Sequence, residues 1–201
     1  MSIMSNDDAE GRAKTDAAGR AKPKRGSRNR TGGGSAKARR KAARLAAVQA
    51  LYQIDLNQIE PTGVAVEAVV GEFVNHRLGE EIDGAKFVAA DPQLFADIVR
   101  GAAHRRAEVD GVLSAALEPR FSLDRLELLL RAILRAGAYE LFVHNDTHPR
   151  ILISEYVDVA HAFFAGREPG MVNGVLDHVA RALRPDELAK PDPSRGQSRE
   201  S

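Results

Sequence analysis

The sequence predicts an all-α fold, a bundle of about six to eight helices. Apolar residues recur at spacings of three and four in several stretches, as amphipathic helices require. The clearest example is the series Leu45, Val48, Tyr52 and Leu56. No segment of strand length alternates polar and apolar residues or collects β-branched residues between turns.

The 201 residues suit one domain with extensions at both ends. Residues 1–36 contain few large apolar side chains and include the triplet Gly32-Gly33-Gly34, so we expect a disordered basic arm. Residues 186–201 are rich in proline, serine and charge, and we expect a disordered tail there. The folded domain is therefore expected over residues 37–185.

The chain contains no cysteine, which excludes disulfides, cysteine-ligated metals and thiol nucleophiles. No stretch approaches the roughly 18 uncharged apolar residues of a membrane span, and the start lacks the apolar core of a secretory signal. We expect a cytoplasmic protein with no membrane partner.

The charges are segregated along the chain, although the net charge is only +1. Residues 1–44 hold 13 Lys and Arg against 4 Asp and Glu, a net +9, whereas the other 157 residues hold 16 against 24, a net −8. Such asymmetry predicts that the basic segment meets a polyanion and that the acidic body meets something else, such as a basic protein.

The first helix is expected from Ala36 to about Leu56, before the breaker cluster at Pro61. Its start carries cations, the wrong sign for the helix dipole, which favours binding of an external anion over the alternative of a solvated helix end. These cations are Lys37, Arg39, Arg40, Lys41 and Arg44. Gln49 and Tyr52 follow on nearly the same face and offer an amide for a base edge and a ring for stacking, although each could instead fill the core or the surface.

A second helix is expected over residues 64–78, followed by a loop to Ala90. Asp91 and Pro92 are typical of an N-cap followed by the first helical residue, and we expect one or two helices before Pro119.

Ser122 is expected to cap the next helix, whose wide apolar arc indicates the central, most buried helix. A turn at residues 145–149 separates it from a helix that continues to about Phe163. The last helix is expected to end at Arg184-Pro185.

Catalytic and metal-binding patterns are not found. His144 and His148 have the spacing of zinc ligands on a helix, but the residues between them predict a loop, so we expect helix-terminal histidines and no metal. Neighbouring carboxylates such as Asp124 and Glu127 are common on helix surfaces. We expect no cofactor and no enzymatic activity.

An Asn-Gly pair stands near the start of the last helix. Glycine costs about 1 kcal/mol there relative to better helix formers, so Gly174 indicates close packing or a capping role. Asn173 could instead face a nucleic acid.

Several short motifs occur together in one order. They are Ala47-Val48-Gln49-Ala50-Leu51-Tyr52 after the basic cluster, Leu134-Arg135 with Ala138-Tyr139-Glu140-Leu141, Ile153-Ser154-Glu155, and Val172-Asn173-Gly174-Val175-Leu176-Asp177. In these motifs the chain resembles the NusB family of bacterial antitermination factors over roughly residues 37–185.

This resemblance implies a fold of two three-helix bundles and binding to the boxA element of ribosomal RNA leader transcripts. It implies a heterodimer with NusE, a small-subunit ribosomal protein, within an RNA polymerase antitermination complex that includes NusA and NusG. When free, the protein would be a monomer or a homodimer. The RNA contacts implied are Lys37, Arg39, Arg40, Lys41, Arg44, Gln49, Tyr52, Met171 and Asn173. The partner contacts implied are Tyr52, Asp124 and Glu127.

Two other interpretations compete. A helical interaction protein with a sticky basic arm would bind any nucleic acid, with a steep salt dependence and no sequence preference. NusB-like domains also begin certain rRNA cytosine methyltransferases, but we expect no catalytic domain here, because the residues after 185 are too few to form one.

Overall fold

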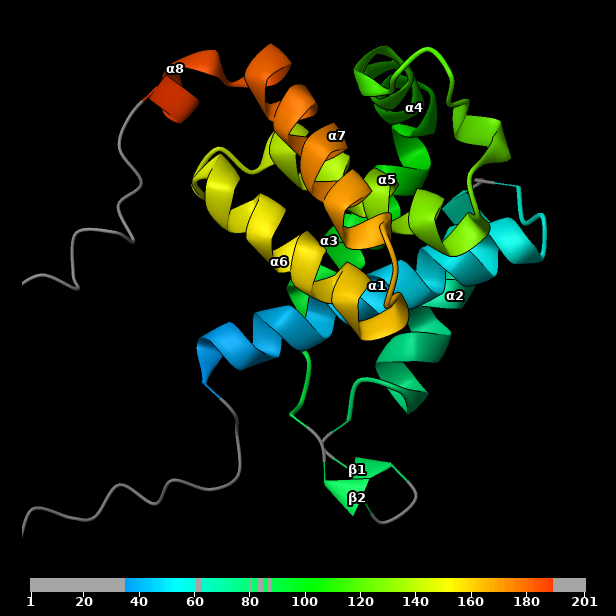
Figure 1. Cartoon of the computed structure of the whole chain (residues 1–201). Helices are drawn as coiled ribbons and strands as arrows, with labels where there is room; N and C mark the ends of the chain where they lie inside the picture. Colours follow the sequence, from blue (N-terminus) through cyan, green and yellow to red (C-terminus); the bar gives the residue numbers. More distant parts are fainter. Residues whose placement is uncertain (1–34, 61–62, 80, 83–84, 87, 190–201) are drawn as a thin grey trace, which may run out of the picture. The chain divides into compact units, whose positions relative to one another are not determined.

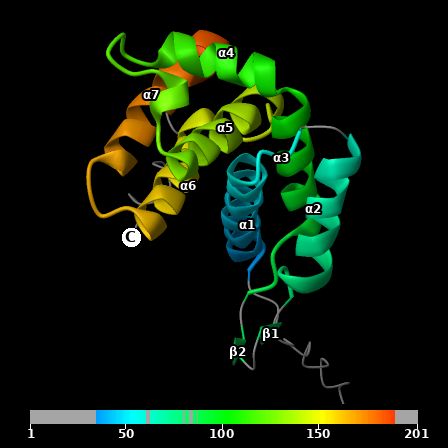
Figure 2. The same ribbon diagram turned by 90° about the vertical axis from the view of Figure 1, so that its right-hand side faces the viewer.

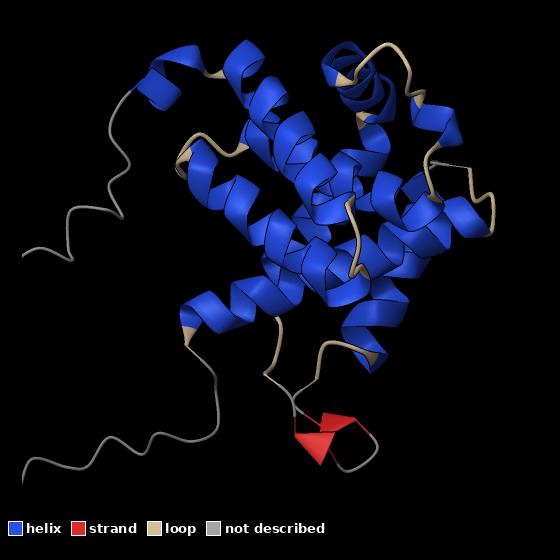
Figure 3. Cartoon of the chain, viewed as in Figure 1, coloured by secondary structure: helices blue, strands red, loops and turns tan. Residues whose placement is uncertain are grey.

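The structure is a computed structural model that describes residues 35–60, 63–79, 81–82, 85–86 and 88–189, all within the unit Gly32–Ser201. The all-α class is confirmed (Figures 1 and 3). One strand pair occurs in the described residues and was not expected, the two-residue hairpin of β1 (Glu81–Ile82) and β2 (Ala85–Lys86). Residues 1–34 of the predicted arm lie outside the described residues. None of the described helices is long and apolar enough to cross a membrane.

The first three-helix bundle consists of α1 (Ala36–Leu56), α2 (Gly63–His76) and α3 (Pro92–His104). The Ser35 hydroxyl accepts a hydrogen bond from the Ala38 amide and so caps α1. The predicted cap of α3 is confirmed, because the Asp91 carboxylate accepts hydrogen bonds from two amides of its first turn. Figure 2 shows α1 between α2 and α3 on one side and α5 and α6 on the other.

Two helices occupy the segment before Pro119, since Arg105 separates α3 from α4 (Arg106–Ala116). The prediction that Ser122 caps the central helix is wrong. Ser122 precedes the 3-10 helix η1 (Leu123–Arg125) without a side-chain cap bond, and α5 (Leu128–Val143) begins after Glu127.

The second bundle consists of α5, α6 (Pro149–Phe163) and α7 (Glu168–Leu183). As predicted, α5 is buried along most of its length. The helix α7 ends before Arg184, but the prediction of a disordered tail is wrong for its first residues, which form α8 (Pro185–Ala189). Residues 190–201 lie outside the described residues.

Helix packing leaves no space for a side chain at two glycines. A Cβ at Gly101 would collide with the Tyr139 ring, and one at Gly137 would come within 2.7 Å of Leu176. Gly174 does not fit the close packing expected of it, because a Cβ there would meet no atom within 4 Å. The close approaches therefore lie on α3 and α5.

Candidate RNA and partner interface

Most cationic side chains of the described residues are held in ion pairs, and the exceptions are informative. The cations with no carboxylate partner in the described part of the chain are Lys37, Arg39, Arg40, Arg125, Arg150 and Arg167. All six are exposed. Cations that the fold does not neutralise are the ones free to bind an external anion.

Three of these cations come from the predicted basic start of α1. Lys37 and Arg40 border a cleft between α1 and α6, which we call the α1–α6 cleft. Its other walls come from the α5–α6 turn and from α6, at Thr147, Arg150 and Ser154. Arg39 is exposed in the same turn of α1, and its carbonyl accepts a hydrogen bond from the Asp91 amide, which ties α3 to this end of α1. The start of α1 is thus a rigid, positively charged edge.

Arg44 also lines the α1–α6 cleft, together with Glu155, but it is not part of the exposed edge, and its pairing argues against the predicted contact with a phosphate. The residue is 5% exposed, and its guanidinium donates two hydrogen bonds to Glu140, from Nε to Oε1 at 2.8 Å and from Nη2 to Oε2 at 2.9 Å. Glu155 lies 3.5 Å from Nη1. An arginine that two buried carboxylates already neutralise has little to offer a phosphate.

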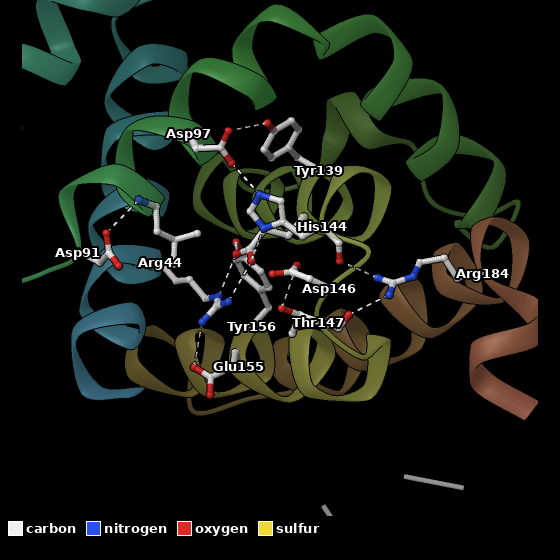
Figure 4. A network of polar contacts seen from close by, with 12 residues as sticks. Arg44, Asp91, Asp97, Tyr139, His144, Asp146, Thr147, Glu155, Tyr156 and Arg184 are labelled. Carbon is white, nitrogen blue, oxygen red and sulfur yellow. Dashed lines mark hydrogen bonds and ion pairs between the residues drawn. The ribbon is translucent and has the colours of Figure 1, made fainter. Parts of the chain in front are cut away.

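The Arg44–Glu140 pair joins α1 to α5, and Figure 4 shows Arg44 beside Glu155 and Tyr156 of α6. Glu140 is fully buried and also accepts a hydrogen bond from the Tyr156 hydroxyl at 2.7 Å. Burial works to raise the pKa of Glu140, but hydrogen bonds from His144, Arg44 and Tyr156 outweigh it and lower the pKa. Burial, and next the charge of Glu140, raise the pKa of Tyr156 well above its usual value. These are structural charges of the core.

His144 extends this cluster to α3. Its Nδ1 lies 3.3 Å from Glu140 and its Nε2 lies 2.7 Å from Asp97, so two carboxylates can accept from the doubly protonated ring. The hydrogen bond to Glu140 raises the pKa of His144 against the opposing effect of burial. Asp97 also accepts from the Tyr139 hydroxyl, whose pKa rises to about 12 through burial and the charge of Asp97. His148, in contrast, caps α6.

The remaining predicted residues of α1 differ in exposure. Lys41 is half exposed and paired with Asp158 of α6 at 2.7 Å, and this hydrogen bond raises its pKa. Gln49 is exposed, whereas Tyr52 is partly buried against the core. Of the cations predicted from the sequence, Lys37, Arg39 and Arg40 are therefore the ones left without an acidic partner.

The structure separates Asn173 from Met171. Asn173 is exposed on α7 and lines a second cleft, the α6–α7 cleft, together with Arg150 and Ser154. Met171 lines a different groove, between the end of α4, η1 and the start of α7, which we call the α4–α7 groove. Of the two residues, only Asn173 lines a cleft that shares residues with the α1–α6 cleft.

The predicted partner residues belong to three elements: the last turns of α1, η1 and the start of α5. Glu127 is exposed at the start of α5 and lines the α4–α7 groove, and Asp124 is exposed in η1. Tyr52 lies one turn before Asp55, whose carboxylate pairs with Arg131 of the first turn of α5 at 3.1 Å. The last turns of α1 and the start of α5 thus adjoin.

Comparisons with known proteins show the family to which the chain belongs. A family model described as NusB family matches residues 41–181. A transcription antitermination protein NusB from Bradyrhizobium sp. (strain BTAi1) is 48% identical over 150 residues, which are 75% of this chain and 86% of the relative. The protein of the same name from Novosphingobium aromaticivorans is 50% identical over 150 residues, 75% of this chain and 97% of the relative. The chain belongs to the NusB family.

Solved NusB structures share the fold. T. maritima NusB superposes with a TM-score of 0.57 at 24% identity, covering 75% of this chain and 97% of that one. A crystal structure of the antitermination factors NusB and NusE in complex with dsRNA matches with a TM-score of 0.55 at 27% identity, covering 71% of this chain and 96% of that one. The expected pair of three-helix bundles is therefore the NusB fold.

Sequence reasoning missed Arg150 and Ser154, which this NusB family member places between the two clefts. Arg150 directly follows Pro149 at the start of α6, where a cation again opposes the helix dipole, and that signal could have identified it.

No group of three His, Asp or Glu side chains in the described part of the chain could hold a metal ion.

Proposed function

We propose that this protein is a transcription antitermination factor that binds the boxA RNA of ribosomal RNA leader transcripts together with the ribosomal protein NusE. In the RNA polymerase complex with NusA and NusG it acts by positioning RNA and partner rather than by catalysis. The proposal rests on membership of the NusB family and on the complex of related NusB and NusE chains with RNA.

One observation carries the RNA-binding part of this proposal, the unpaired cations at the start of α1. Lys37, Arg39 and Arg40 are exposed within the first five residues of α1, have no carboxylate partner among the described residues and oppose the helix dipole. Phosphate groups would relieve this repulsion and release counterions, which gives salt-dependent affinity. Lys41 would add to the same edge, since its partner Asp158 is only a half-exposed surface carboxylate.

Gln49, Asn173 and Met171 are proposed to read bases, each from its own surface. Gln49 and Asn173 expose amides that can pair with base edges, and Met171 offers an apolar contact in the α4–α7 groove. Arg44 is left out of the proposed site because its guanidinium is buried on Glu140.

NusE is proposed to bind at the other end of α1, at Tyr52, Asp124 and Glu127. The two carboxylates are exposed, have no cation partner among the described residues and suit a basic ribosomal protein. Tyr52 would add an aromatic contact at the rim of its partly buried ring.

Fluorescence anisotropy of labelled single-stranded boxA RNA, a scrambled RNA of equal length and a boxA duplex tests the proposal. Measurements are made at two salt concentrations, with and without NusE. We expect the protein to prefer boxA and NusE to strengthen that preference. Equal affinity for the scrambled RNA in the presence of NusE would contradict the proposal.

The alternative is a nucleic-acid-binding helical protein without sequence preference, whose affinity comes from the N-terminal arm. A variant lacking residues 1–34 discriminates, since it keeps Ser35 as the cap of α1. Retained boxA preference would place specificity in the helical domain, whereas loss of all binding would favour the alternative.

A further inference from the structure

Arg150 differs from the other unpaired cations because it lies on α6 yet borders the same cleft as Lys37 and Arg40. Its side chain is exposed, and its Nη2 donates one hydrogen bond, to the Leu188 carbonyl at 3.3 Å. A neutral acceptor leaves the guanidinium charge uncompensated and leaves other N–H donors free. Arg150 is therefore placed and charged to bind an anion.

Arg150 and Ser154 border two clefts at once. They form one wall of the α1–α6 cleft, opposite Lys37 and Arg40, and also one wall of the α6–α7 cleft, which contains Asn173. Both residues are exposed, and a spacing of four places them on one face of α6. They thus form a continuous edge from one cleft to the other.

The α6–α7 cleft combines apolar surface with an unpaired cation. Its other arginine, Arg181, is paired with Asp177 at 2.7 Å, which leaves Arg150 as the unpaired cation of its described lining. Ile153 and Val157 supply apolar surface. Single-strand sites hold the backbone with cations and place the bases against side-chain surface, usually aromatic, and in this cleft Ile153 and Val157 would supply that surface.

We propose that Arg150 and Ser154 guide a single RNA strand out of the α1–α6 cleft, across α6, and into the α6–α7 cleft toward Asn173. This inference rests on the proposed RNA-binding function. Arg150 binds a backbone phosphate, and the Ser154 hydroxyl donates to a phosphate or ribose oxygen next to it. The track joins Asn173 to the basic start of α1, which the sequence alone leaves unconnected.

The test uses Arg150→Gln in the full chain, with labelled single-stranded boxA RNA as the probe and affinity measured over a range of salt concentrations. Loss of one charge-assisted phosphate contact should weaken binding about tenfold. The salt dependence, log K against log salt, should become shallower by about 0.7. Arg100→Gln is the matched control, because Arg100 is an exposed arginine of α3 that lies in neither cleft and pairs with Glu67. The control should leave both quantities unchanged.

A rescue variant tests whether a cation elsewhere on this edge of α6 can replace Arg150. Ser154→Lys added to Arg150→Gln returns a cation one helical turn along the same edge, and it should restore the salt dependence. An Arg150→Gln protein with wild-type affinity and wild-type salt dependence overturns the inference. An equal loss of affinity for duplex RNA also overturns it, because the proposed track through the α6–α7 cleft takes a single strand. Failure of the wild-type protein to prefer boxA over scrambled RNA counts against the proposed function instead, because the salt dependence can be read with either single strand.

Discussion

The charged side chains at the two ends of α1 differ in whether they have ion-pair partners. At its start, Lys37, Arg39 and Arg40 are exposed and have no carboxylate partner among the described residues. At its end, the Asp55 carboxylate is 4% exposed and meets three arginines. These are Arg106 at 3.2 Å, Arg131 at 3.1 Å and Arg135 at 2.6 Å.

This difference shows that the role of a charged side chain on a helix depends on the residues that the fold places beside it. The acid at the end of α1 joins it to α4 and α5, so its charge serves the fold. The cations at the start repel one another and the helix dipole without compensation inside the described structure, which is why we propose that they bind a ligand. Arg44, two turns into α1, is paired within the fold, as Asp55 is, although the sequence places it among the cations at the start of the helix.

The largest expected effect comes from Arg44→Met. Without the cation of Arg44, the fully buried Glu140 keeps a charge that only the Tyr156 hydroxyl and the His144 ring can offset. We expect the free energy of unfolding, measured in urea, to fall by about 3–5 kcal/mol. The double variant Arg44→Met, Glu140→Leu should recover a good part of this loss, because it removes the buried charge as well. A loss below about 1 kcal/mol in the single variant would place Arg44 among the surface cations.

A smaller loss is expected from Asp55→Asn at the far end of α1. The amide keeps the shape of the side chain but removes the charge that three arginines share. Because Arg135 keeps its bidentate partner Asp110, at 2.6 and 2.7 Å, only part of the network is lost. We expect a loss of about 1–3 kcal/mol in urea unfolding. Binding of single-stranded RNA should be unchanged, and weakened RNA binding in a still folded variant would contradict the contrast between the two ends.

Arg40→Gln should show the reverse pattern. Arg40 has no ion pair to lose in the described structure, so the free energy of unfolding should change by less than about 0.5 kcal/mol. Its affinity for single-stranded boxA RNA should fall about tenfold, as for loss of one charged contact. Unfolding in urea and RNA anisotropy on the same sample check both halves. A destabilised variant with normal RNA affinity would mean that Arg40 serves the fold.

The sequence predicts most of the fold because helical periodicity and capping are local. The start of α3 at Asp91 and the burial of α5 were both predicted from neighbouring residues. The environment of Arg44 was not, since its partner Glu140 lies 96 residues away. The sequence of α5 did indicate a buried ion pair, because Glu140 lies within a wide apolar arc and a buried carboxylate needs a cation partner. The partner's identity still required the packing of α1 against α5.

The same dependence on distant partners predicts a small pH effect at His144, which connects the buried acid of α5 to α3. Its pKa is raised in the folded protein, chiefly by the hydrogen bond to Glu140 and further by Asp97. The protonated ring therefore stabilises the fold fully below its unfolded pKa, near 6.5, and this contribution is lost as pH rises through the folded pKa. The difference in unfolding free energy between wild type and His144→Gln should be larger at pH 6 than at pH 8.5. A difference that does not change with pH would mean that the His144 ring beside Glu140 and Asp97 stays neutral. Arg44 alone would then compensate the charge of Glu140.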